Sequence, residues 1–409
     1  MRGKGRALVA VLIVIAIILA TAYAYNRGWL SLPDDEHTPI PYQATMVNER
    51  EVSLDIQNVG AGVDLSTVRL TLYGPGLGQG QWRLSGGLDG AVDLLPGIDL
   101  SYQDDNGDGK LSAGDGVTIY SDEGLAHGVW HLNVAYPCGS GEFNESLRFQ
   151  ILPTGVEPFE DDLTVYFLNV GQGDAELVHT SDGKWVLIDA GPGAGTDMLL
   201  QQLEAHGVDR LEALIISHPH LDHYAGADEV LDAYEVRSVY HPGLASSASS
   251  FAKFLDAVDA EGCPVYTDEH LDPGDYLNIS LSEDFRVMSI ASSGDSNEAS
   301  LVLLVANQNM SVLFTGDLGE DGEALFVEQW RNIDVDIDVL KVGHHGSRYS
   351  STLEFIQLIR PEHAVIEVGA DNSYGHPHGE TLNLFAELEI KVYRTDIDGD
   401  VLIEQTMFS

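Results

Sequence analysis

The segment Ser217 to Gly226, SHPHLDHYAG, concentrates side chains that bind metal ions. It follows the apolar run EALII and contains a histidine array made of His218, His220, Asp222 and His223. A loop that leaves a strand can point alternate imidazoles at one ion while the next two side chains address a second ion. Neutral imidazole and carboxylate groups suit Zn²⁺ or Mn²⁺. Since Cys138 and Cys263 are the only cysteines, a cysteine-rich zinc site is excluded.

A second candidate metal site lies in the sequence DDNGDGKLSAGD. Its spacing is that of a calcium loop, and the side-chain oxygen donors would come from Asp104, Asn106, Asp108, Ser112 and Asp115. The last of these donors is an aspartate where EF-hands prefer glutamate, and strand-like sequence flanks the loop, so we do not expect a helix-loop-helix sensor. Two interpretations stay open: a structural calcium site, or an acidic turn that binds no ion tightly.

Three further motifs carry a resemblance to a known family: FLNVGQGDAELV, LKVGHHGS and NSYGHPH. Together with the histidine array, and with the strand ends IDAG at Asp189 and TGD at Asp317, they resemble the metallo-β-lactamase fold, an αββα sandwich. More narrowly, they are similar to the C-terminal hydrolase domain of the DNA-internalisation competence protein ComEC. The resemblance covers about residues 163 to 405 and does not extend to the channel part of that family.

The resemblance implies a role for each matching residue. The implied metal ligands are His218 and His220 for one ion, Asp222 and His223 for the other, Asp317 as the bridge between them, and either His344 or His345 to complete the second site. Asp189 would orient the histidine loop, because a ligating imidazole needs its other ring nitrogen fixed.

One element of the family pattern is missing. Metallo-β-lactamase enzymes commonly supply a third histidine to the first metal before the bridging aspartate. Here the candidates upstream of Asp317 are His241, which lies too close to the array, and His270, which lies in the loop YTDEHLDPGD. Asn297 or Ser300 could instead supply an oxygen, which would leave the first site open or suited to a harder ion such as Mn²⁺ or Mg²⁺.

Two divalent ions about 3.5 to 4 Å apart would activate a water molecule and stabilise the attacking and leaving oxygens of a phosphodiester. The catalytic residues would then be Asp222 and Asp317, assisted by Lys341 and His376. The side chains that could hold a phosphate are Lys341, Ser347, Arg348 and His376. Arginine would do so by a bidentate contact and lysine as a point charge. The alternative is that Lys341 and Arg348 belong to a solvated loop.

The elements that must position these residues form an α/β domain over residues 163–409. Apolar runs such as WVLIDAG, SVLFTGD and DVLKVG alternate there with the helix-like segments TDMLLQQLEAHG and SSFAKFLDAVDAEG. Residues 43–151 are typical of a small β-sandwich, because short strands such as STVRLTLYG and GVWHLNVAY alternate with glycine-rich turns. We expect linkers at 27–42 and 152–162.

Residues 1–26 carry the pattern of a membrane segment. Arg2, Lys4 and Arg6 precede an uncharged run from Ala7 to Tyr25, which is long enough to cross a bilayer as one helix. Positive charge before the run favours a cytoplasmic N-terminus, with the folded domains outside the cytoplasm. A cleaved signal peptide is the alternative, since residues 20–24 offer small side chains for cleavage.

The charge of the chain limits its partners. It has 65 Asp and Glu against 20 Lys and Arg, a net charge of −45, which excludes a protein that coats nucleic acid by electrostatic attraction. We therefore predict a membrane-anchored hydrolase with two Zn or Mn ions, acting on DNA or another phosphodiester. Two alternatives remain: a hydrolase of another ester, a lactone or a β-lactam, and a non-catalytic surface-binding module.

Overall fold

The computed structural model of the chain divides into two units, residues 1–159 and 160–409, which are described separately. The described residues are 42–48, 51–56, 63–64, 68–74, 77–83, 98–103, 110–111, 116–121, 125–138, 141–151, 162–244, 248–290, 297–331, 335 and 337–408. The predicted membrane segment and the five predicted calcium ligands lie outside them. Within the described ranges, no helix combines the length and the apolar character that crossing a bilayer requires.

The described part of the first unit consists of strands. They are β1 (Tyr42–Asn48), β2 (Glu51–Ile56), β3 (Val63–Asp64), β4 (Arg69–Gly74), β5 (Leu77–Arg83), β6 (Ile98–Gln103), β7 (Lys110–Leu111), β8 (Gly116–Ser121), β9 (Gly128–Cys138) and β10 (Gly141–Ile151). Two antiparallel four-stranded sheets have the orders β1-β2-β8-β6 and β10-β9-β4-β5, and β3 pairs with β7. Val129, Trp130, His131 and Leu132 are all buried along β9, so this stretch of the strand is covered on both faces. That the two sheets pack as one sandwich stays a prediction.

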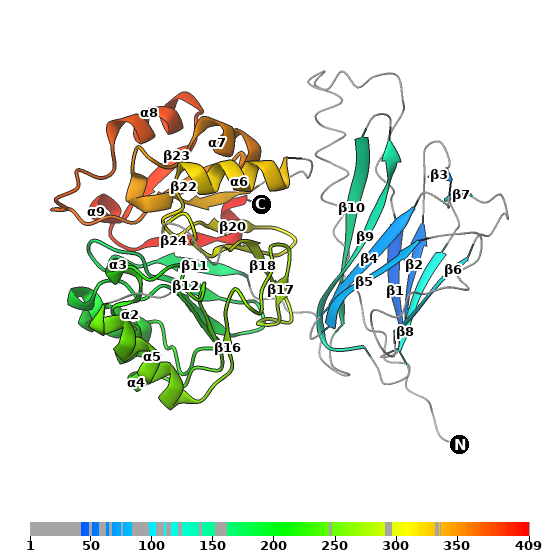
Figure 1. Cartoon of the computed structure of the whole chain (residues 1–409), viewed down its shortest axis with the longest axis horizontal. Helices are drawn as coiled ribbons and strands as arrows, with labels where there is room; N and C mark the ends of the chain where they lie inside the picture. Colours follow the sequence, from blue (N-terminus) through cyan, green and yellow to red (C-terminus); the bar gives the residue numbers. More distant parts are fainter. Residues whose placement is uncertain are drawn as a thin grey trace. The chain divides into compact units, whose positions relative to one another are not determined.

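The second unit contains two seven-stranded sheets with helices on their outer faces (Figure 1). The first sheet has the order β16-β15-β14-β13-β12-β11-β24. Its strands are β11 (Thr164–Phe167), β12 (Glu176–His179), β13 (Trp185–Ile188), β14 (Ala213–Ile215), β15 (Val239–Tyr240), β16 (Val265–Tyr266) and β24 (Val401–Glu404). The helices of this half are η2 (Gly193–Gly195), α2 (Thr196–Ala205), α3 (Leu221–Tyr224), α4 (Ala227–Ala233) and α5 (Ser249–Glu261).

The second sheet has the order β17-β18-β19-β20-β21-β22-β23. Its strands are β17 (Tyr276–Leu277), β18 (Asp284–Ser289), β19 (Val302–Ala306), β20 (Ser311–Phe314), β21 (Val339–Lys341), β22 (His363–Ile366) and β23 (Lys391–Arg394). The helices of this half are α6 (Glu320–Trp330), η3 (Gly343–Gly346), α7 (Leu353–Ile359), α8 (Gly379–Glu387), α9 (Thr395–Asp398) and η4 (Gln405–Phe408).

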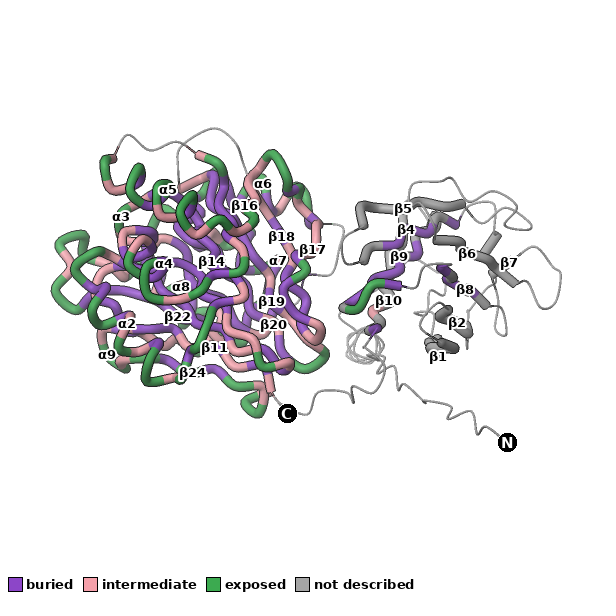
Figure 2. Tube along the Cα trace, turned by 90° about the horizontal axis from the view of Figure 1, so that it is seen from below, coloured by how far each residue is buried: buried purple, intermediate pink, exposed green. Residues whose placement is uncertain are grey.

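Three apolar clusters hold the layers together. The central one joins the facing surfaces of the sheets and includes Val165, Ile188 and Phe314. The outer clusters pack α2, α4 and α5 on the first sheet and α6, α7 and α8 on the second. Burial on both faces of the central strands explains why they are almost continuously apolar in sequence (Figure 2). The predicted αββα sandwich is confirmed for this unit.

Candidate metal centre

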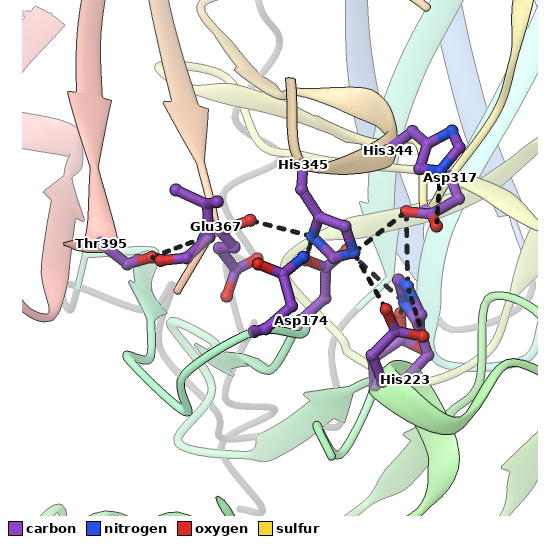
Figure 3. A network of polar contacts seen from close by, with 12 residues as sticks. Asp174, His223, Asp317, His344, His345, Glu367 and Thr395 are labelled. Atoms are coloured by element: carbon purple, nitrogen blue, oxygen red, sulfur yellow. Dashed lines mark hydrogen bonds and ion pairs between the residues drawn. The ribbon is translucent and has the colours of Figure 1, made fainter. Parts of the chain in front are cut away.

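The predicted ligands meet at the carboxyl ends of the parallel strands. Strands β13 to β16 run parallel in the first sheet, and β20 to β23 run parallel in the second. The histidine array follows β14, whereas Asp317 follows β20 and His345 follows β21. Loops at this edge of an open α/β sheet are the usual place for ligand-binding groups. The centre therefore takes side chains from both sheets, as Figure 3 shows for His223 and Asp317.

A first group of ligand atoms comes from His218, His220 and Asp317, and these atoms lie within 4.8 Å of one another. Nε2 of His218 lies 3.7 Å from Oδ2 of Asp317. Burial lowers the pKa of His218 well below its usual value, so its imidazole is neutral, which is the form that binds metal.

A second group comes from Asp222, His223 and His345, again with ligand atoms within 4.8 Å of one another. Nε2 of His345 lies 3.3 Å from Oδ2 of Asp222. Oδ1 of Asp317 lies 3.3 Å from Nε2 of His223 and 3.8 Å from Nε2 of His345. Asp317 thus faces both groups, in the position that a bridging carboxylate would need.

The structure distinguishes the two neighbouring histidines. His345 is buried, and its Nδ1 donates a hydrogen bond of 2.9 Å to the carbonyl of Glu367 (Figure 3). His344 is partly exposed, and its Nε2 lies 4.0 Å from Oδ2 of Asp317. Both residues adopt positive φ, near 50°, and their ring planes are inclined by 68° to each other. The geometry favours His345 as the ligand and leaves His344 at the rim.

The residues present fit divalent metal ions. Nε2 of His218, Nε2 of His223 and Oδ1 of Asp317 are buried and have no hydrogen-bond partner. Buried polar atoms are normally satisfied, so three atoms without a hydrogen bond at one place indicate a missing partner, although Nε2 of His223 and Oδ1 of Asp317 form an ion pair at 3.3 Å. The donors are imidazole nitrogen and carboxylate oxygen only, a set that suits zinc or manganese.

The ionisation states of His223 and Asp317 depend on each other. Burial alone would lower the pKa of His223, but the carboxylates of Asp317 and Asp189 outweigh it and raise that pKa well above its usual value. Burial would raise the pKa of Asp317, yet His223 and His345 hold it well below its usual range. A bound cation would take over the charge compensation that His223 now gives the carboxylates.

Asp189, the predicted orienting residue, contacts the histidine loop at several points. It follows β13 with φ of 53°, and its Oδ2 accepts a hydrogen bond of 2.7 Å from Nδ1 of His223. Its Oδ1 accepts the backbone N–H of Ser217 at 2.7 Å, and its Oδ2 accepts the Ser217 hydroxyl at 2.6 Å. This contact fixes both the ring and the backbone of the array.

Asp174 was not predicted, although it lies in the motif VGQGD. Its Oδ1 lies 3.1 Å from Nδ1 of His345, and its Oδ2 lies 3.5 Å from Nδ1 of His223. The neighbouring Gly173 allows this approach, because a Cβ there would lie 2.3 Å from the backbone oxygen of Asp222. The backbone N–H of Asp174 donates to that same oxygen at 3.1 Å. Asp174 therefore contacts two histidines of the second group from behind.

The structure corrects the predicted role of Lys341. Its side chain is fully buried, pairs with Asp174, and donates a hydrogen bond of 3.0 Å to the carbonyl of Gly316. Burial lowers the pKa of Lys341 to about 8 despite the nearby Glu367 carboxylate. The amine is buried and bonded to Asp174 and Gly316, so it does not contact a substrate phosphate in this arrangement.

The two predicted phosphate contacts Ser347 and Arg348 also point elsewhere. Ser347 is buried, and its hydroxyl accepts the backbone N–H of Tyr349 at 3.3 Å. The guanidinium of Arg348 pairs with Glu380 at 2.6 Å. Neither residue lines the cavity described below.

Two further carboxyl groups lie beneath the centre. Glu176 and Glu367 are buried, and their ligand atoms lie within 4.8 Å of those of Asp174. Burial and the neighbouring Glu367 raise the pKa of Glu176 well above its usual value. One oxygen of Glu367 accepts the backbone N–H of Ala175 at 3.1 Å, which ties this group to the Asp174 loop.

A cavity of about 370 Å³ opens onto the ligands. Its lining residues are Gln172, His220, Leu221, Asp222, Asn297, Asp317, His344, His345, Tyr374 and His376. His376 thus reaches the centre, as predicted. Burial, together with the nearby His345 and His344, lowers the pKa of His376 to about 4, so its ring is neutral at neutral pH.

The described residues supply no third histidine to the first group. Nδ1 of His241 accepts the backbone N–H of Gly243, and His270 hydrogen-bonds within its own loop. Asn297 lines the cavity, and the hydroxyl of Ser300 accepts the backbone N–H of Asp317 at 3.3 Å. Of the two predicted oxygen donors, Asn297 is therefore the one that faces the centre.

Comparison with known proteins agrees with this geometry. Residues 168–369 match the family described as the metallo-beta-lactamase superfamily. The chain is 34% identical over 256 residues to ComE operon protein 3 of Bacillus subtilis, covering 58% of this chain and 32% of that protein. It is 31% identical over 246 residues to competence protein ComA of Neisseria gonorrhoeae, covering 59% and 32% of the respective chains. The chain thus spans about a third of the length of these curated relatives.

Among solved structures, the metallo hydrolase Igni18 of Ignicoccus hospitalis is 17% identical with a TM-score of 0.39, over 59% of this chain and 98% of that one. The family match includes the histidine array, Asp317 and His345. Residues 168–369 thus match the metallo-β-lactamase superfamily of metal-dependent hydrolases, and the chain is similar to the ComEC-like competence proteins.

Proposed function

We propose that this protein is a phosphodiesterase that acts on nucleic acid with two divalent ions. The observation that carries the proposal is the position of Asp317 between two groups of ligand atoms, at the floor of an open cavity. Two adjacent divalent ions supply charge stabilisation and water activation for phosphodiester hydrolysis when they are bound. The match to competence protein ComA supports nucleic acid as the substrate.

The residues of the chain would divide the work as follows. His218 and His220 would hold one ion, Asp222, His223 and His345 the other, and Asp317 both. Asp189 and Asp174 would keep the imidazole rings in place. Asp189 accepts a hydrogen bond from Nδ1 of His223, and Asp174 faces Nδ1 of His345; in both rings Nε2 would be the ligand atom. His344 and His376, at the cavity wall, can donate hydrogen bonds to the oxygens of a bound phosphodiester.

The membrane topology is also part of the proposal. The basic residues before the apolar run at 7–25 support a single anchor with the hydrolase domain outside the cytoplasm. Membrane fractionation followed by protease treatment of intact cells tests it. A hydrolase domain that stays protected in intact cells and is digested only after lysis would contradict this topology.

For the loop at 104–115, a rise in melting temperature of the protein with millimolar calcium would support an ion site there.

The decisive experiment combines metal content with activity. Elemental analysis after supplementation with zinc and manganese should find close to two ions per chain, and the loaded protein should degrade single- or double-stranded DNA. Asp317→Asn should lower the ion content and abolish activity without changing the far-ultraviolet circular dichroism. Activity on lactones or β-lactams, with none on nucleic acids, would replace the phosphodiester proposal while leaving the metal centre intact. Less than half an ion per chain would favour the non-catalytic alternative.

A further inference from the structure

The wall of the cavity carries a large exposed aromatic ring. Tyr374 lines the cavity, yet 64% of its surface stays accessible. Its ring stacks on His376 with centroids 5.7 Å apart and an interplanar angle of 23°. The ring of His376 in turn lies 6.3 Å from that of His345. Tyr374 is therefore one ring removed from a predicted ligand of the second ion.

The loop that carries Tyr374 is fixed in place. Oδ1 of Asn372 accepts the backbone N–H groups of Tyr374 at 3.2 Å and His376 at 3.0 Å. Nδ2 of the same side chain donates to the carbonyls of Gly369 at 2.9 Å and His376 at 2.7 Å. One asparagine thus closes the loop on itself. An exposed ring on a fixed loop loses little conformational freedom when a ligand covers it.

The described lining of the cavity offers a phosphodiester no permanently charged cation. Among the described lining residues there is neither lysine nor arginine. The two basic side chains predicted to hold a phosphate are paired elsewhere, Lys341 with Asp174 and Arg348 with Glu380. A chain of charge −45 also repels a polyanion at long range. Apart from the ions, substrate affinity must therefore come from uncharged contacts. Among the lining residues, Tyr374 and the half-exposed Leu221 are large, exposed apolar side chains.

We infer that Tyr374 is a stacking site for an unpaired nucleobase next to the phosphodiester that is cleaved. This inference rests on the proposed function and narrows its substrate to strands or strand ends whose bases are unpaired. Every nucleobase has a π-face, so stacking on an aromatic ring binds single strands without sequence preference. A base inside a duplex cannot cover Tyr374 because both of its faces are already stacked.

The test compares a single-stranded oligonucleotide with an abasic one of equal length, which has the same phosphates and no rings. Tyr374→Leu should raise KM for the first by about 5- to 150-fold, the range expected for one lost stacked base, and leave KM for the abasic strand unchanged. Tyr374→Trp should retain the wild-type KM. Tyr349→Leu is the matched control, because Tyr349 is equally exposed and does not line the cavity.

Three results would overturn the inference: an equal loss on both strands in Tyr374→Leu, no loss on either, or equal KM of the wild-type protein for duplex and single strand. Oligonucleotides of DNA and RNA are run in parallel, and dependence on Tyr374 with either one supports stacking. If the wild-type protein cleaves none of them, the proposed function fails. The dissociation constants of the same labelled strands, measured by fluorescence anisotropy, then test the stacking site. Tyr374→Leu should raise the dissociation constant of the oligonucleotide and leave that of the abasic strand unchanged.

Discussion

Oδ1 of Asp174 lies 3.1 Å from Nδ1 of His345, while Nε2 of that ring faces Asp222 and Asp317. The carboxylate thus contacts the histidine from the side opposite the proposed ions. Such contacts fix the ring orientation and the tautomer of a ligand and increase its basicity. Because Oδ2 of Asp174 also faces His223, a single side chain acts on two of the three ligands in the second group.

Asp174→Asn should therefore weaken metal binding by about 10- to 100-fold at the second site and leave the first site nearly unchanged. The loss arises because an amide is a weaker acceptor for imidazole N–H groups than a carboxylate. Chelator competition with the zinc-loaded protein measures it as two separate dissociation steps. Asp197→Asn, an exposed substitution in the first turn of α2, is the control. Unchanged affinity at both steps would show that the carbonyl of Glu367 alone orients His345.

Lys341→Met should destabilise the protein by about 3 to 5 kcal/mol, because it leaves the carboxylate of Asp174 buried without its cation. Methionine has a similar length and no charge, so lost packing contributes little. Urea unfolding in the presence of a chelator measures the change. The double variant Lys341→Met/Asp174→Asn should recover part of the loss, since it removes the stranded charge. Equal instability of the single and double variants would contradict the ion-pair explanation.

Stability should depend on Glu323 between about pH 4.5 and 7. Burial raises the pKa of Glu323 to about 7, although it accepts the backbone N–H of Thr352 at 2.7 Å. With the folded pKa above the unfolded one, its contribution is complete below about pH 4.5. As pH rises to about 7, stability falls by up to about 3 kcal/mol because the unfolded chain ionises first.

Glu323→Gln cannot ionise and keeps one oxygen for the backbone N–H groups of Ser351 and Thr352, which precede α7. The unfolding free energy of the wild-type protein minus that of this variant should therefore decrease as pH rises from 5 to 8. Using the difference cancels the pH dependence of the other carboxylates. Parallel profiles over that range would mean that Glu323 titrates normally.

Salt should distinguish this protein from basic nucleases. Repulsion between a −45 chain and DNA is screened as ionic strength rises, so KM for DNA should fall or stay level between low and moderate salt. A protein that neutralises phosphates with basic side chains shows the opposite trend. Steady-state kinetics at constant free metal concentration measures it. A steep rise of KM with salt would point to a basic surface outside the described residues.

Much of the α/β unit was predictable because its central strands are buried on both faces. Runs such as WVLIDAG and SVLFTGD correspond to β13 and β20, and the two predicted helices correspond to α2 and α5. In the first unit, β5 was not predicted, because its sequence LGQGQWR contains two glycines and only two apolar residues and so has no strand-like alternation. The histidine array was visible because all four side chains lie within one short segment.

Other parts of the centre depend on contacts that no local pattern encodes. Asp174 and Lys341 are 167 positions apart, and only the packing of the two sheets makes them partners. Lys341 ends a buried strand, so its amine must pair inside the protein instead of reaching solvent. The choice between His344 and His345 depends on two consecutive left-handed backbone conformations, which neither strand nor helix periodicity can indicate.

The pairing of β24 with β11 has a consequence for synthesis of the protein. Residues 164–167 pair in register with residues 401–404, which the ribosome makes long after them. At about 5 to 20 residues per second, the nascent chain waits on the order of ten seconds or more with one edge of β11 unpaired. An open edge is a template for pairing with other chains. Nascent chains of this protein should therefore need chaperone protection until the final strand emerges.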